Sequence, residues 1–226
     1  MPEDTVFTDP TDANAMASAR TTQRWGGLAS FLLAVTFIVP PLIYLVGDLR
    51  DSLGPFAYSL ADFLYGPVWA ASLVTMVFAL REHVGSRAPR RMSLALLAAV
   101  LAAGAMGFVA FIRASNRHYH LVHPELHLEM DTTVLVVWTT IIAGVSNAGW
   151  HFLGWAFVLT GSAGWTTGRI PRLLSALYLL AGAVSLFVYL LPMPDSEGFA
   201  VMLGVVVSLW QGVLMWRARP EGAQAP

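Results

Sequence analysis

The chain has 226 residues, of which 56% are hydrophobic and only 12% are charged. Soluble domains usually carry about 25% charged residues, so this composition leaves too little polar surface for a water-facing globule. The net charge of -1 gives no basic excess of the kind that nucleic-acid-binding proteins use, and the absence of cysteine excludes disulfides and thiolate chemistry. We therefore predict an all-α, polytopic transmembrane helical bundle, with the lipid bilayer as its main partner and no nucleic acid.

All thirteen basic residues are arginine, a composition that suggests a GC-rich bacterial genome. We accordingly expect a multi-pass protein of the bacterial inner membrane. Residues 1–20 carry acids before any basic residue, unlike a signal peptide, and contain few apolar side chains. We predict a disordered cytoplasmic tail over residues 1–20, a transmembrane domain over residues 21–219 and a short polar tail over residues 220–226.

Six apolar runs are long enough to cross about 30 Å of hydrocarbon as helices. The predicted spans cover residues 26–46, 64–81, 92–112, 132–160, 173–191 and 199–216. Pro40-Pro41 lies in the last third of the first span, where we expect a kink or an early stop. Pro55 is suited to open a short interfacial helix, which Gly66-Pro67 is expected to separate from the second span.

Glycines mark two further features of the spans. Gly104 and Gly107, with Ala103 and Ala110, make one side of the third span small, which would let a neighbouring helix approach closely. Gly161, Gly164 and Gly168 follow the fourth span and are expected to end it.

Arginine is distributed unequally between the two ends of these spans. With the N-terminus inside, ten arginines lie on the inner side and three on the outer side. Cytoplasmic loops carry an excess of Lys and Arg, so we predict that both termini are cytoplasmic. The histidine-rich loop between the third and fourth spans would then lie outside.

That loop, in the stretch RHYHLVHPELHLEMD, combines histidines with acids, and such ligands suit zinc and similar divalent metals. His123-Pro124-Glu125 is typical of a helix start, and His127 and Asp131 would share a face of that helix. His118 and His120 would lie before the helix. The stretch matches no strict motif such as HExxH, and a solvated loop or a pH-sensing or partner-binding segment are alternatives. The candidate metal ligands are His120, His123, His127 and Asp131.

A polar stripe lies inside the fourth span. Thr140, Gly144, Asn147, His151 and Gly154 recur at steps of four and three, which places them on one face of a helix. Polar groups near the bilayer centre are costly and normally face the bundle interior. Asn147 and His151 either bond to neighbouring helices and fix their packing, or line a pocket in which His151 carries a proton, ligates a cofactor or contacts substrate.

Asp62 lies among aromatic residues, with Tyr58, Tyr65 and Trp69 nearby in sequence. An acid beside aromatic rings has the chemistry to protonate an alkene and shelter the resulting cation, as an isoprenoid cyclase or isomerase requires. The alternative is an ordinary aromatic belt with an interfacial acid. Asp62, Asn147 and His151 are therefore the candidate catalytic residues.

The second half of the chain resembles a bacterial family of small six-span membrane proteins that is known as a domain of unknown function. The resemblance covers roughly residues 130–217 and rests on the run SNAGWHFLGWAFVLTGSAGWTTGRIPRLLSALYLLAGAVSLFVYLL and on the ending LWQGVLMWR. It implies a six-span fold and carries over no catalytic residues.

Three classes of function follow from these patterns. The leading hypothesis is a non-catalytic membrane protein that binds a lipophilic small molecule, a membrane partner or further copies of itself. The alternative is a membrane-embedded enzyme, either an isoprenoid cyclase or isomerase or a metal-dependent hydrolase that uses the outer His and acid loop. Transport is a third class, which the lack of charged residues within the spans disfavours.

Overall fold

The computed structural model describes residues 10–50, 53–84, 86–122, 132–190 and 196–218. Within these ranges the chain is helical apart from short turns and has no strand, which confirms the all-α prediction. The elements are α1 (Pro10–Leu49), α2 (Pro55–Phe63), the π-helical turn η1 (Leu64–Val68), α3 (Trp69–Val84), α4 (Pro89–Val122), α5 (Thr132–Thr167), α6 (Arg172–Phe187) and α7 (Ser196–Arg217).

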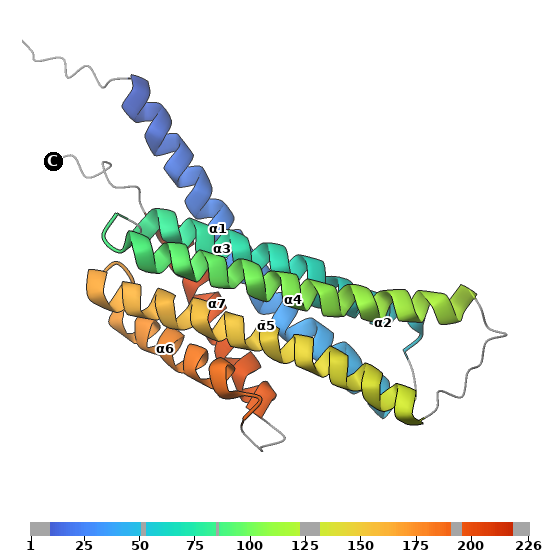
Figure 1. Cartoon of the computed structure of the whole chain (residues 1–226). Helices are drawn as coiled ribbons and strands as arrows, with labels where there is room; N and C mark the ends of the chain where they lie inside the picture. Colours follow the sequence, from blue (N-terminus) through green and yellow to red (C-terminus); the bar gives the residue numbers. More distant parts are fainter. Residues whose placement is uncertain (1–9, 51–52, 85, 123–131, 191–195, 219–226) are drawn as a thin grey trace, which may run out of the picture.

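The long helices form a closed ring in chain order (Figure 1). Helix α1 packs against α3, α3 against α4, α4 against α5, α5 against α6, α6 against α7, and α7 returns to α1. Aromatic side chains fill the interior: the ring of Phe37 lies 6.4 Å from Trp150 and 6.2 Å from Trp69, and Phe157 lies edge-on to Tyr178 at 5.3 Å. Such pairs contribute about 0.5–1.5 kcal/mol each beyond the area they bury.

The described helices have the length and composition of a multi-pass membrane protein. Five of them, counting Pro55–Val84 as one helix, are long and apolar enough to cross a bilayer, while α6 is apolar but has only 16 residues. Large apolar side chains are exposed along the outer faces of the bundle. Exposing those faces to water would cost free energy, whereas contact with the hydrocarbon of a bilayer would not.

The second membrane helix is longer than its predicted span, because the chain does not break at Gly66-Pro67. Proline lacks an N–H and its ring would clash with the carbonyl four residues earlier in a regular helix. The backbone instead widens into η1, where the Trp69 N–H bonds to the Leu64 carbonyl five residues back. A side chain at Gly66 would collide with Ala110 of α4. Pro55 does open α2, as predicted.

Helix α1 corrects two further expectations. The prediction of a disordered tail over residues 1–20 is wrong for residues 10–20, which form the first turns of α1; residues 1–9 lie outside the described part. Once the apolar span is helical, adding residues to it needs no new nucleus, and the alanines of this segment favour helix. Of the two alternatives at Pro40-Pro41, a kink or an early stop, the early stop is wrong, because the helix continues to Leu49.

The glycines at the C-terminal part of α5 have different roles from those predicted. Gly168 alone ends the helix, with a φ of 67° that suits glycine. Gly161 and Gly164 lie within α5, and a Cβ there would approach Ser175 of α6 to 2.8 Å and 2.6 Å. The small side of the third span is used in part: a Cβ built at Gly66 of η1 would collide with Ala110 and lie 3.8 Å from the Gly107 Cα, whereas Gly104 is exposed and has no atom within 4 Å of a built Cβ.

The bundle has a histidine end and an arginine end. At the histidine end, which carries His118 and His120, α4 finishes and α5 begins (Figure 1). At the arginine end, which carries Arg87, Arg90 and Arg91, α3 finishes and α4 begins.

Candidate functional site

A cavity of about 640 Å³ opens in the half of the bundle nearer the histidine end. Its walls come from α1, η1, α4, α5 and α7, which are far apart in the chain. The lining residues are Pro40, Pro41, Tyr44, Tyr65, Arg113, Trp138, Thr139, Ile142, Ala143, Ser146, Asn147, Trp150, Glu197, Gly198 and Val201.

The short length of α6 explains why the cavity lies there. Helix α5 has 36 residues and α6 has 16, so α6 covers only part of α5. Their contact includes Gly154, where a Cβ would lie 2.8 Å from the Gly182 carbonyl, and His151, whose Nδ1 lies 3.3 Å from the Leu186 carbonyl. Helix α6 ends one residue later, at Phe187. The preceding turns of α5 have no α6 beside them and supply one wall of the cavity.

The cavity combines apolar and polar lining. Proline, isoleucine, valine and tryptophan side chains form most of the surface, and Arg113, Glu197, Tyr44, Tyr65 and Asn147 add charge and hydrogen-bonding groups. Concave sites of about 300–1,000 Å³ with a mainly apolar lining and few polar groups are typical of small-molecule sites.

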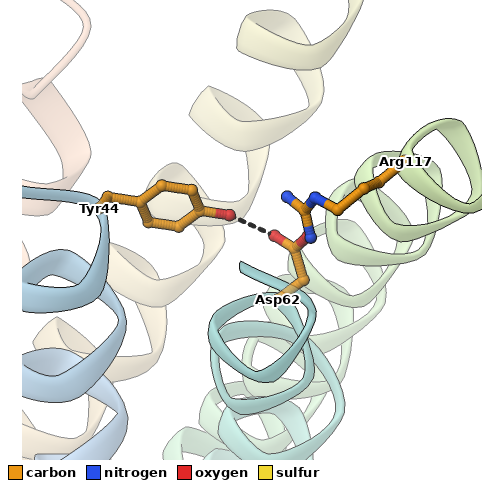
Figure 2. Close-up of polar contacts among 3 residues, drawn as sticks. All are labelled: Tyr44, Asp62 and Arg117. Carbon is orange, nitrogen blue, oxygen red and sulfur yellow. Dashed lines mark hydrogen bonds and ion pairs between the residues drawn. The ribbon is translucent and has the colours of Figure 1, made fainter. Parts of the chain in front are cut away.

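Beside the cavity, a buried carboxylate joins three helices (Figure 2). Asp62 of α2 is 3% exposed; its Oδ1 accepts a hydrogen bond of 2.6 Å from the Tyr44 hydroxyl of α1, and its Oδ2 lies 2.8 Å from Arg117 Nη1 of α4. The Arg117 guanidinium also lies 5.3 Å from the centre of the Tyr58 ring, which adds a cation–π contact. Both carboxylate oxygens are thus bonded, one of them to a cation.

The aromatic residues that were predicted to surround Asp62 lie in three different places. Tyr58 contacts the ion pair through Arg117, but Tyr65 lines the cavity and Trp69 is buried in the core. Asp62 itself lies behind Tyr44 rather than in the cavity wall. As an ion-pair partner Asp62 has the geometry of a link between helices, and it is connected to the cavity wall through the Tyr44 hydroxyl.

The polar stripe of α5 does not face a single site. Thr140 is exposed and its hydroxyl donates to the Val136 carbonyl of its own helix at 2.7 Å, and Gly144 is exposed with no neighbour within 4 Å of a built Cβ. Asn147 lines the cavity, whereas His151 and Gly154 lie against α6. A common helical face therefore meets different surroundings along its length, because α6 is shorter than α5.

Both ring nitrogens of His151 are occupied. Trp155 Nε1 donates to His151 Nε2 at 3.2 Å, so Nε2 carries a lone pair and the proton is on Nδ1, which then donates to the Leu186 carbonyl at 3.3 Å. The two bonds require the same neutral tautomer. This geometry favours the packing interpretation of His151 over a proton-carrying role.

The predicted metal site mostly lies outside the described residues, which include neither His123, His127 nor Asp131. His118 and His120 belong to α4, which runs to Val122, so the expectation that they lie in a loop is wrong; the helix predicted from His123 lies outside the described residues. Across the ranges that the structure describes, no group of three or more His, Asp or Glu side chains is placed to hold a metal ion. The metal-dependent hydrolase stays a prediction.

Several lining residues escaped the sequence analysis, above all Arg113, Glu197 and Trp138. Arg113 and Glu197 lie next to predicted spans and Trp138 lies near the start of one, where a charged or aromatic side chain is ordinary. Only the convergence of α1, α4, α5 and α7 gives them a shared surface. Of the lining residues, Asn147 was named from the sequence as a possible pocket residue, and Pro40-Pro41 as a possible break in a helix.

Comparison with protein-family models, with curated proteins and with solved structures finds no match to this chain. The resemblance of residues 130–217 to a six-span family therefore stays a prediction.

Proposed function

We propose that this chain is a multi-pass protein of the bacterial inner membrane that crosses the bilayer six times, with both termini cytoplasmic. Five long apolar helices and the shorter α6 support this topology. At 1.5 Å per residue α6 spans about 24 Å, which local thinning of the bilayer can accommodate. The excess of arginine at the arginine end supports a cytoplasmic location for that end.

The topology can be tested with reporter insertions. A reporter placed after Asp195 should be periplasmic, and one placed after Arg219 should be cytoplasmic, because a single crossing by α7 separates them. Alkaline phosphatase and green fluorescent protein fusions give opposite readouts for the two compartments. Reporters that land on the same side would contradict the six-span topology.

We propose that the function of this protein is to bind a lipophilic small molecule in the cavity between α1, α4, α5 and α7. The observation that carries this proposal is the cavity itself, of about 640 Å³, with an apolar lining and a few polar groups. Trp138 and Trp150 provide flat apolar surface, and Asn147 provides an amide that can orient a bound molecule. A binding role also fits the bonds that two of the candidate catalytic residues make to other helices: Asp62 is bonded to Tyr44 of α1, and His151 to the Leu186 carbonyl of α6.

Filling the cavity should abolish binding. In the Ala143→Phe variant a phenyl ring replaces a methyl group in the cavity wall. Native mass spectrometry of protein purified in a mild detergent should show a lipophilic molecule retained by the native chain. The amount retained should fall roughly tenfold or more in the variant, because the bound molecule would clash with the added ring.

The matched control is Ala71→Phe, which adds the same ring to an exposed position of α3. This variant should retain the molecule as the native chain does. A native chain that carries no small molecule, or equal retention by Ala143→Phe and Ala71→Phe, would count against the proposed function.

A further inference from the structure

Two arginines on neighbouring turns of α4 have different surroundings. Arg117 is neutralised by Asp62 at 2.8 Å. Arg113, four residues earlier and therefore on the same side of the helix, lines the cavity and is partly buried. Arg113 makes no hydrogen bond or ion pair with any residue that the structure describes. A guanidinium offers five N–H donors, and withdrawing them from water without partners costs free energy.

Other donors in the same cavity are also unused. Tyr65, Ser146 and Asn147 line it, and none of their side chains forms a hydrogen bond within the described ranges. The Tyr44 hydroxyl is different, because it already donates to Asp62. The wall therefore presents one cation and at least three neutral groups able to donate. Their natural complement is a group rich in acceptors.

The single acid in the lining does not neutralise Arg113. Glu197 lies in the first turn of α7, is exposed, and forms no ion pair among the described residues. Its carboxylate is stabilised there by the positive end of the helix dipole, so it needs no cation from the cavity. Among the described residues no carboxylate forms an ion pair with Arg113, which lines the cavity.

We infer that the molecule bound in this cavity is an amphiphile with an acidic headgroup, a carboxylate or a phosphate, and that Arg113 binds this headgroup. The inference rests on the proposed binding function and adds the chemical class of the ligand. Guanidinium pairs with both groups through parallel charge-assisted hydrogen bonds. Tyr65 and Asn147 supply further donors, and the apolar surface around Pro41, Ile142 and Trp150 accommodates the rest of the molecule.

The test compares three probes with the same chain: dodecanoate, dodecyl phosphate and dodecan-1-ol. Each is titrated into the full-length protein in micelles of an uncharged polyoxyethylene detergent and measured by native mass spectrometry. At least one acidic probe should bind tighter than the alcohol by about tenfold or more, as expected for charge-assisted bonds. The tighter of the two acids distinguishes a carboxylate from a phosphate ligand.

Variants of Arg113 then test whether its guanidinium binds the acidic headgroup. Arg113→Gln should lose about tenfold or more in affinity for the acid and none for the alcohol, while Arg113→Lys, which keeps the charge, should retain most of the preference. Arg50→Gln, at an exposed position of the same end outside the cavity, should behave as the native chain does. Circular dichroism and gel filtration establish that the variants fold.

The outcomes separate this inference from the proposed function. Equal affinity for acid and alcohol in the native chain, or an unchanged acid preference in Arg113→Gln, would overturn the acidic headgroup while leaving cavity binding in place. The comparison of acid and alcohol affinities in the native chain tests the acidic headgroup even if the Arg113→Gln variant does not fold. The proposed function itself fails if no probe binds the native chain and the Ala143→Phe variant retains the same molecules, in the same amounts, as the native chain.

Discussion

Replacing Arg117 by methionine should lower the free energy of unfolding by about 3 kcal/mol, the scale expected when one partner of a buried ion pair is removed. Methionine keeps the apolar stem of the side chain but leaves Asp62, which is 3% exposed, with only the Tyr44 hydroxyl as partner. The uncompensated carboxylate would be poorly solvated where α1, α2 and α4 meet. Unfolding of the protein by SDS in mixed micelles, followed by circular dichroism, measures the change.

A double-variant cycle identifies the source of this loss. Asp62→Asn keeps the shape of the side chain without its charge, so the variant with both Asp62→Asn and Arg117→Met should recover much of the lost stability. The matched control is Arg50→Met, an exposed arginine near the same end with no ion pair among the described residues. That variant should change the free energy of unfolding by less than about 0.5 kcal/mol. A double variant no more stable than Arg117→Met would contradict the role given to the buried carboxylate.

Replacing Gly182 by alanine should lower the free energy of unfolding by about 2 kcal/mol, within the range found for overpacked cores. A Cβ at Gly182 would lie 2.7 Å from the Val158 backbone nitrogen and 2.8 Å from the Gly154 carbonyl. Both atoms belong to the backbone of α5, which cannot move aside by changing a rotamer. The two helices would have to separate, and α5–α6 packing would weaken. The same SDS titration reports the loss.

Gly104→Ala provides a control in which the sign of the effect reverses. Gly104 is an exposed glycine of α4, and no atom lies within 4 Å of a Cβ built there. Alanine is favoured over glycine within a helix by up to about 1 kcal/mol, so this variant should be as stable as the native chain or slightly more stable. Equal loss in Gly104→Ala and Gly182→Ala would mean that close contact with α5 is not the cause.

Hydrophobic composition was enough to predict an all-α membrane bundle, because a helix that satisfies its own backbone is the ordinary way to cross hydrocarbon. The predicted spans lie within the observed helices α1, α4, α5 and α7, and Pro55 was correctly placed at the start of α2. Boundaries were less accurate. Local breakers such as Gly66-Pro67 and Gly161 did not end helices, because a π-turn accommodates Pro67 and close packing on α6 uses Gly161.

The sequence by itself was thus enough to predict helices suited to a lipid bilayer, the all-α class and the position of most of the apolar segments. These properties follow from the composition of each segment alone. Tertiary structure decided the rest: that Asp62 pairs with Arg117, that His151 is bonded to α6, and that Arg113 lines a cavity and has no ion-pair partner among the described residues. Partners separated by tens of residues leave no periodic signal in a single sequence, and the cavity exists because α6 is too short to cover α5.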